Sequence, residues 1–476
     1  MTINSWKEEL NKKDIKELLS NNKKLLEEVN KKCNAFVTII DNPEYFENKN
    51  SLLNGVPYSA KDMFSTKGIL TTGSSNSLKD YVPFFDATVI KRLKESGAIL
   101  TSKAAGDEFG LGATGTTCHT GAVRNPYDLN RQAGGSSSGS AVAVATGVVP
   151  FSLGTDTGDS VRKPAAYCGI VGFKPTYGVI SRYGVLPFAS SLDHVGVFAN
   201  SVKDASVVVD AIKGPDGKDM TALNEMPAFT PSLDGNIKGK KIFYIKEICN
   251  LDSYDSPSDE LISSINKFNE TIDKLRNLGV EVIEESINQK LLNALYPTYQ
   301  VISCAEATSN LSMYTGIIYG PRGIGSNIND MVKDYRTNGF SPLIKRRLVI
   351  GSYVLQKENQ ERYFLNACKV RRLVINTFNE LFNKYDAFIT MASAQGAPLL
   401  NAKGEVLTQE AVLENHLCIA NFGGYPSITI PNGYVNNLPI GVNITGKVMD
   451  DANVLNIAYA LEKEINFKST LGGTNE

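Results

Sequence analysis

The sequence contains few histidines and lacks the features of several protein classes. Its 476 residues include only three histidines, His119, His194 and His416. None of them occurs in the context of a G-x-S-x-G nucleophile motif, so a Ser–His–Asp triad is not expected. No run of 18 apolar residues occurs, so no membrane-spanning helix is predicted. The first residues lack the apolar stretch of a secretory signal, and we therefore expect a cytoplasmic protein that binds no membrane.

An excess of charge and paired cysteines are also missing. The chain holds 49 basic and 50 acidic residues, a net charge of −1, so its overall charge does not attract nucleic acid and a small-molecule site is favoured. The seven cysteines are scattered and include no C-x-x-C pair. We therefore expect reduced thiols, with neither a disulfide framework nor a metal site.

Length and composition indicate a soluble α/β enzyme. A chain of 476 residues exceeds the usual size of a single core, so one large domain with insertions, or two domains, is expected. Hydrophobic residues make up 42% and charged residues 21%, values typical of soluble globular enzymes. Short apolar runs alternate with helical patterns over residues 53–215, which favours a sheet with helices on its faces.

The other segments are assigned from hydrophobic spacing and composition. Residues 2–38 have apolar residues three and four positions apart, which predicts an amphipathic pair of helices. Residues 214–237 are rich in Pro, Gly and Asp and predict a connector. The predicted division is an N-terminal helical segment at 1–50, a first core part at 51–215, a connector and helical insert at 216–383, and a C-terminal part completing the sheet at 384–476.

Two clusters of small and hydroxyl residues are the most informative feature of the chain. GGSSSGS at 134–140 and GTDTGDS at 154–160 flank an apolar run, AVAVATGVVPFSL, that predicts a buried helix and strand. A flexible Gly/Ser linker does not enclose such a run. Glycine allows the backbone to approach a ligand, while hydroxyls and backbone N–H groups supply nucleophiles and anion-binding donors. The two clusters therefore indicate a catalytic site.

These clusters, with the segments RKPAAYCGIVGFKPTYG and GVPYSAKDMF, resemble the amidase signature family, which hydrolyses amides with a Ser–cisSer–Lys triad. The resemblance implies an α/β fold with a mixed central sheet, helices on both faces and a smaller helical insert. It also implies that Ser160 is the nucleophile, that Ser136 is the bridging serine after a cis peptide, and that Lys61 is the base. The backbone N–H groups implied for the oxyanion hole are those of Asp156, Thr157, Gly158 and Asp159.

The role implied for Lys61 makes a physical demand on its surroundings. A lysine accepts a proton only when it is neutral, and burial among apolar groups lowers the pKa of an ammonium group. Lys61 follows an apolar strand-like run and precedes Met63 and Phe64, so we expect it to be buried.

The chain departs from the family pattern at two positions. Asp159 stands where the family usually has Gly directly before the nucleophile, and Lys163 stands where it usually has Gln. A carboxylate beside an oxyanion hole opposes the developing negative charge. Because Asp159 and Lys163 are four residues apart, we expect them to pair on a helix and turn the carboxylate outward. On that interpretation Asp159→Gly leaves the turnover number nearly unchanged.

Further segments resemble the branch of this family that supplies ammonia for tRNA amidation. They are SRYGVLPFASSLDHVG, SCAEATSNLSMYTGIIYGPR and SPLIKRRLVIGSYVL. In that branch the substrate is glutamine, held by its α-carboxylate and α-amine. The resemblance implies that Arg347, rather than Arg346, binds the carboxylate, that Glu414 binds the amine and that Tyr299 forms a pocket wall.

The same resemblance implies partners for this chain. An amidotransferase B subunit would use ATP and Mg²⁺ to activate mischarged Glu-tRNA(Gln), Asp-tRNA(Asn) or both, and a small C subunit would complete a heterotrimeric ligase. The chain has no G-x-x-x-x-G-K-[ST] loop, so we expect it to hold no cofactor and to leave tRNA contact mainly to the partner. Two alternatives remain: a stand-alone amidase acting on a small or fatty amide, and a non-catalytic scaffold.

Overall fold

The computed structural model of the protein describes residues 1–401 and 411–471. Within these residues eleven strands form one mixed sheet, in the spatial order β1-β3-β2-β4-β6-β5-β10-β11-β9-β7-β8. The strands are β1 (Phe36–Ile39), β2 (Pro57–Lys61), β3 (Ile99–Ala104), β4 (Phe151–Asp156), β5 (Val171–Lys174), β6 (His194–Ala199), β7 (Lys241–Ile245), β8 (Glu281–Glu285), β9 (Ala387–Met391), β10 (Ser427–Val435) and β11 (Leu438–Thr445).

Parallel pairing at the centre of the sheet places the ends of two functional strands together. β2 pairs in parallel with both β3 and β4, so their carboxyl ends lie at the same edge. The side chains of all three strands are buried on both faces, as expected for strands covered by helices. β2 ends at Lys61 and β4 ends at Asp156, so this edge carries the first two parts of the predicted site.

The C-terminal strands complete the sheet begun by the first half of the chain. β10 pairs antiparallel with β5, with Ser427 opposite Lys174, and β11 lies between β10 and β9. The predicted mixed sheet is therefore confirmed.

Helices cover both faces of the sheet, as predicted. α4 (Ser138–Ala145) and α5 (Arg162–Cys168) pack on one face, and α3 (Thr88–Glu95), α6 (Val202–Ile212), α8 (Asp259–Asn277) and α17 (Asp451–Ile465) pack on the other. α4 consists of small and apolar residues and is buried over most of its length, as expected for a helix with no face toward solvent. Shorter helices are α7 (Lys246–Cys249), α15 (Ala411–Asn415) and α16 (Cys418–Gly423).

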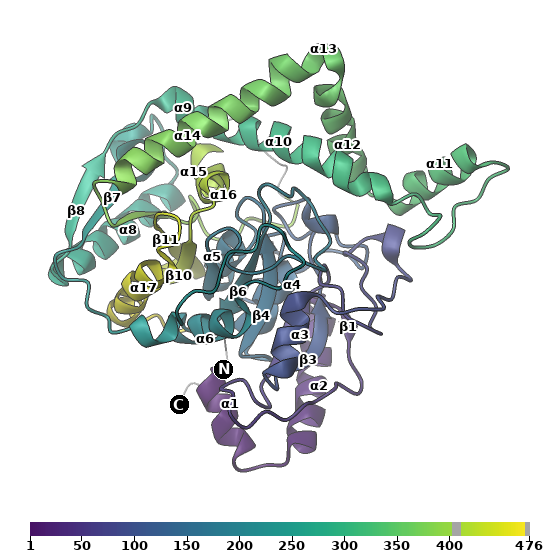
Figure 1. Ribbon diagram of the computed structural model, residues 1–476. Helices are drawn as coiled ribbons and strands as arrows, with labels where there is room; N and C mark the ends of the chain where they lie inside the picture. The colour runs from purple at the N-terminus through teal and green to yellow at the C-terminus, as the bar shows by residue number, and fades with distance from the viewer. Residues whose placement is uncertain (402–410, 472–476) are drawn as a thin grey trace.

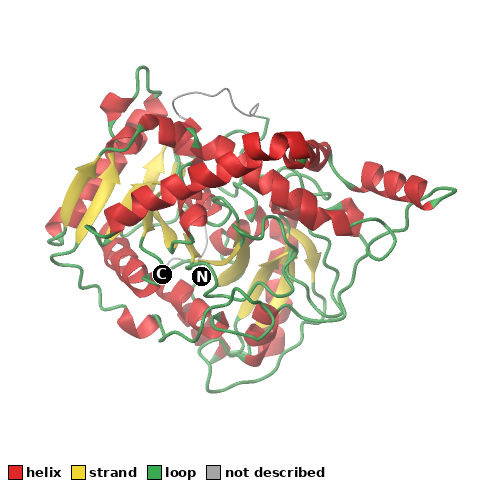
Figure 2. Ribbon diagram, turned by 45° about the horizontal axis from the view of Figure 1, so that its top comes forward, coloured by secondary structure: helices red, strands yellow, loops and turns green. Residues whose placement is uncertain are grey.

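A helical layer built from residues 289–382 crosses above the sheet (Figures 1 and 2). It consists of α9 (Gln289–Asn293), α10 (Leu295–Asn310), α11 (Ile328–Gly339), α12 (Pro342–Leu355), α13 (Lys357–Gln360) and α14 (Asn366–Phe382). α10 packs along α12 and α14, while α11 lies at the end of an arm that projects from the body (Figure 1). The predicted helical insert corresponds to this layer.

The helical prediction for the N-terminal segment was wrong at the C-terminal end of that segment. Residues 2–38 were expected to be helical, and they form α1 (Ile3–Leu10) and α2 (Ile15–Cys33), but β1 begins at Phe36. Asn34 ends α2 in a left-handed conformation, which asparagine adopts more readily than most residues. The segment FVTI then pairs antiparallel with β3, so a long-range pairing overrides the helical spacing.

Candidate active site

The turn between β4 and α5 carries the predicted nucleophile, and Asp156 fixes its shape. The Asp156 carboxylate is fully buried, accepts a hydrogen bond of 2.9 Å from the Val161 N–H and pairs with Arg162 at 2.9 Å. Burial alone would raise the pKa of Asp156, but the Arg162 guanidinium holds it well below its usual value. Asp156 is therefore ionised, and it ties the start of α5 to the end of β4.

Arg162 extends this network to the C-terminal part of the chain. Its guanidinium is fully buried and donates to the backbone oxygen of Gly158, the backbone oxygen of Leu417 and the side chain of Asn421, each at 2.7 Å. Asn421 lies on α16 and also donates to the Asp156 carboxylate at 2.9 Å. The turn is thus held from three sides, which pre-organises its backbone.

Lys61 and Ser136 meet in the buried centre of the site. The Lys61 Nζ lies 2.7 Å from Ser136 Oγ and 2.8 Å from Thr155 Oγ1. The Gly135–Ser136 peptide is cis, as the family resemblance implies. Ser137 Oγ donates to the Thr155 backbone oxygen at 3.0 Å. This bond fastens the Gly/Ser loop to β4 directly before the nucleophile turn.

Burial gives Lys61 the property that its predicted role demands. Its side chain is fully buried. This burial lowers the pKa of Lys61 to about 7, against the smaller opposing effect of the carboxylates of Asp107, Asp193 and Asp156. A substantial fraction of Lys61 is therefore neutral near neutral pH.

The backbone of the nucleophile turn offers a set of N–H donors. Within the part of the chain that the structure describes, the N–H groups of Thr157, Gly158, Asp159 and Ser160 donate no hydrogen bond. Ser160 is itself 4% exposed, two residues before α5 begins. Such unpaired donors beside a hydroxyl are what an oxyanion hole requires. Asp156, also predicted for this hole, contributes its carboxylate to the scaffold described above.

A small cavity opens beside this turn and contains two of the predicted glutamine-binding residues. Its volume is about 70 Å³, and Tyr299 from α10 and Arg347 from α12 line it together with Gly158 and Asp159. One guanidinium nitrogen of Arg347, Nη1, is buried without a hydrogen-bond partner in the described chain. A β-carbon at Gly158 would lie 3.0 Å from the Tyr299 ring, so glycine permits this close approach.

The structure places Glu414, the third predicted glutamine-binding residue, differently. Among the described residues that line this cavity, Asn415 is present and Glu414 is not. The Glu414 carboxylate instead pairs with Lys163 at 3.1 Å. Lys163 also pairs with Asp159 at 3.1 Å, so the predicted Asp159–Lys163 pair forms. The expectation that this pair turns the carboxylate outward was wrong, because Asp159 precedes α5 and its side chain lies against the cavity with only 15% exposed.

Comparison with known proteins agrees with this geometry. Residues 15–455 match the family model described as Amidase. The chain belongs to the amidase family. The A subunit of the glutamyl-tRNA(Gln) amidotransferase of Pelagibacter ubique is 39% identical over 88% of this chain and 85% of its own length. The corresponding A subunit of Caldanaerobacter subterraneus subsp. tengcongensis is 37% identical over 98% and 97%.

A solved structure of this amidase branch has the same fold. The crystal structure of the A subunit of the glutamyl-tRNA(Gln) amidotransferase from Thermotoga maritima matches with a TM-score of 0.77 at 34% identity, over 94% of each chain. The predicted resemblance to the amidase signature family and to its tRNA-amidation branch is therefore confirmed. The curated relatives favour that branch over a stand-alone amidase.

The pH dependence of this amidase tests the state of Lys61. Because only neutral lysine accepts a proton and burial lowers the pKa of Lys61 to about 7, activity should rise as pH increases through about 7. A solvent-exposed lysine would place the rise near its ordinary pKa of about 10.4. The measurement is kcat/KM for amide hydrolysis against pH. A profile that is flat from pH 6 to 9 would contradict this assignment.

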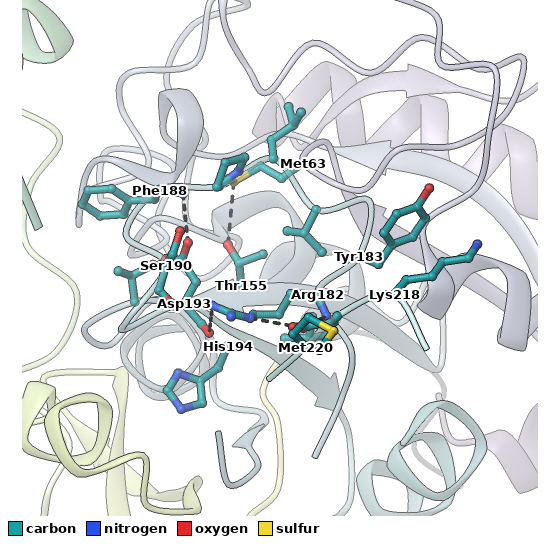
Figure 3. Close-up of a pocket in the computed structure, with 16 residues that line it drawn as sticks. Met63, Thr155, Arg182, Tyr183, Phe188, Ser190, Asp193, His194, Lys218 and Met220 are labelled. Carbon is teal, nitrogen blue, oxygen red and sulfur yellow. Dashed lines mark hydrogen bonds and ion pairs between the residues drawn. The ribbon is translucent and has the colours of Figure 1, made fainter. Parts of the chain in front are cut away.

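A second, larger cavity is lined by residues that neighbour the amidase triad. It has a volume of about 260 Å³, and Met63, Thr155, Thr157 and Asp193 contribute to its wall (Figure 3). Thr157 Oγ1 donates to the Asp193 carboxylate at 2.7 Å. Thr155 also contacts Lys61 at 2.8 Å, so this cavity lies one side chain away from the base.

Sequence reasoning missed the groups that orient the triad. The Thr155 hydroxyl donates to the Met63 sulfur at 3.7 Å, so its oxygen accepts from Lys61 and leaves the lysine lone pair for Ser136. Asp107 accepts hydrogen bonds from the backbone of residues 114–117, and its own N–H donates to the Ser136 backbone oxygen at 3.0 Å. Thr155 lies inside the GTDTGDS motif, whereas Asp107 carries only the signal of a carboxylate after a buried strand.

Two absences complete the description. Within residues 1–401 and 411–471 no cluster of three or more His, Cys, Asp or Glu side chains is arranged to hold a metal ion. No helix in that part of the chain has the length and hydropathy needed to span a bilayer.

Proposed function

We propose that this chain hydrolyses the side-chain amide of glutamine and supplies the ammonia to a partner protein that amidates a mischarged tRNA. The observation that carries the proposal is the position of Arg347, whose unpaired, buried guanidinium nitrogen lines a cavity beside the nucleophile turn. A buried polar nitrogen of a cationic group that lacks a partner is stabilised when a ligand supplies an anion. A free α-carboxylate supplies it, whereas a fatty amide has none.

The proposed reaction uses Lys61, Ser136 and Ser160 in turn. Neutral Lys61 accepts the Ser136 proton while Ser136 accepts the Ser160 proton, and Ser160 Oγ attacks the amide carbon. The N–H groups of the turn stabilise the resulting oxyanion. The C–N bond then breaks, the proton held by Lys61 returns through Ser136 to the leaving nitrogen, and ammonia departs. Water hydrolyses the remaining ester on Ser160 by the same relay and releases glutamate.

The ammonia has a route away from the glutamine side. We place this route in the cavity of Figure 3, because Thr155 lines that cavity and also contacts Lys61. ATP, Mg²⁺ and the tRNA acceptor end are assigned to the amidotransferase B subunit, with the C subunit bracing the complex. The relatives are named as A subunits of glutamyl-tRNA(Gln) amidotransferases, which supports a complex of several subunits. The partner determines whether Glu-tRNA(Gln), Asp-tRNA(Asn) or both are amidated.

Ammonia release from glutamine tests the proposed function. The purified chain is assayed alone and after co-expression with the B and C subunits. Glutamine hydrolysis that is strongest in the complex supports the proposal. Hydrolysis of simple fatty amides with no activity on glutamine would favour the stand-alone amidase instead, and no hydrolysis of any amide would favour the scaffold.

Arg347 should set the affinity for glutamine. Arg347→Met is expected to raise the KM for glutamine by about ten- to hundredfold, because a charge-assisted hydrogen bond to a carboxylate contributes about 1.5–3 kcal/mol. Steady-state kinetics of ammonia release measure the effect. Arg346→Met, at the neighbouring exposed position on α12, is the matched control and should leave KM unchanged. An equal rise in both variants would contradict the assignment.

A further inference from the structure

Three charged side chains lie together beside the glutamine-side cavity. Lys163 Nζ lies 3.1 Å from an oxygen of Asp159 and 3.1 Å from an oxygen of Glu414, and the three side chains are 6%, 15% and 27% exposed. One cation between two carboxylates leaves one negative charge without a counterion. Because the cluster is largely shielded from water, that charge is poorly compensated by solvent.

The two carboxylates differ in how fully they are engaged. Lys163 Nζ donates both to the Glu414 backbone oxygen and to Glu414 Oε2, and the other carboxylate oxygen, Oε1, accepts from the Ala394 N–H at 3.4 Å. Glu414 is therefore held by groups outside the cavity. Asp159 lines the cavity itself, directly before Ser160 in the chain.

The opposite charge lies in the same cavity. Arg347 and Asp159 both line it, with Tyr299 in the same wall. Burial raises the pKa of Tyr299, and the charges of both Arg347 and Asp159 act on its phenol, so Tyr299 lies close to both groups. The cavity thus has a cation with one unpartnered nitrogen and an anion that shares its Lys163 counterion with Glu414, and an aromatic ring lies close to both. A zwitterion matches this arrangement.

We propose that Asp159 binds the α-ammonium group of the substrate while Arg347 binds its α-carboxylate. The inference rests on the proposed function, which makes that substrate glutamine. In this arrangement Lys163 neutralises Glu414, the carboxylate that the sequence predicted to bind the amine. Asp159 then binds the α-ammonium group in its place. The two departures from the family pattern, Asp159 and Lys163, thus act together: the carboxylate that binds the amine is at position 159 instead of position 414. Asp159 is a specificity-determining residue of this chain.

The test compares two substrates that differ only in the α-amine. They are L-glutamine and glutaramate (5-amino-5-oxopentanoate), which keeps the carboxylate and the amide. Asp159→Asn in the complete complex is expected to raise the KM for glutamine about ten- to hundredfold, the usual effect of losing a hydrogen bond between charged groups. The KM for glutaramate should change little, so wild-type discrimination between the two substrates is largely lost.

Glu414→Gln is the matched control, because it removes one charge from the other carboxylate that pairs with Lys163. It should keep a clear preference for glutamine over glutaramate, but a smaller one than wild type, because Lys163 then pairs with Asp159 alone among the carboxylates described here. Equal effects of Asp159→Asn on both substrates, or loss of discrimination in Glu414→Gln alone, would overturn the proposal. If Asp159→Asn does not fold, Asp159→Gly is used in the same comparison.

The outcome separates this proposal from the function on which it rests. A wild-type complex that hydrolyses no glutamine contradicts both. A wild-type complex that hydrolyses glutamine and prefers it to glutaramate, with the same preference in Asp159→Asn, leaves the proposed function intact and overturns only the assignment of Asp159.

Discussion

Ser160→Ala is expected to reduce glutamine hydrolysis by about a thousandfold or more, the usual cost of removing a nucleophile. The turn that carries Ser160 is fixed by Asp156 and Arg162, neither of which the substitution touches. The variant should therefore fold normally while losing the attacking oxygen. Ammonia release from glutamine measures the loss, and thermal unfolding of the variant confirms its fold.

Externally supplied ammonia provides the internal control for Ser160→Ala. If the partner's site is intact, the variant complex should amidate tRNA with ammonium salt at the wild-type level while failing with glutamine. Near-normal glutamine hydrolysis by Ser160→Ala would show that the nucleophile is another residue.

Lys61→Ala should be as damaging as Ser160→Ala, because groups that act as one relay do not contribute additively. Lys61 is the only base in contact with Ser136 within the described chain, at 2.7 Å. Lys61→Arg should fail as well, since a guanidinium group stays protonated and cannot accept the Ser136 proton. Ammonia release from glutamine measures both losses.

Two further variants serve as controls for Lys61: one at an exposed lysine and one that combines both triad substitutions. Lys67→Ala removes an exposed lysine just beyond β2 and should leave activity unchanged. The double variant Lys61→Ala/Ser160→Ala should be no worse than either single variant. An active Lys61→Arg enzyme would remove lysine from the mechanism.

Local sequence patterns were sufficient to predict the elements that hold the triad. The apolar run between the two Gly/Ser clusters forms α4 and β4, and the alternation around residues 88–104 forms α3 and β3. α3 is predictable because its apolar residues recur at helical spacing, and α4, β3 and β4 are predictable because each is a short, mostly apolar run of the kind that is buried on all sides. The expected burial of Lys61 follows from the same rule, since it ends a strand covered on both faces.

Contacts between distant parts of the chain were not predictable in the same way. The pairing of β1 with β3 replaced a predicted helix end, and the contact between Lys163 and Glu414 joins α5 to α15. No local sequence pattern indicates either contact, because each joins residues that the overall fold brings together from distant parts of the chain. Asp159 pairs with the same lysine that contacts Glu414 of the distant α15. The residue was therefore identified from the sequence as unusual, but its orientation was predicted wrongly.

Trapping the acyl-enzyme tests the central claim most directly. The complex is mixed with glutamine, quenched in acid within the first turnover, digested and examined by mass spectrometry. The account predicts a γ-glutamyl ester on the peptide that contains Ser160, and no such ester when Ser160→Ala is treated identically. An ester on Ser136 or on any other residue, with Ser160 unmodified, would contradict it.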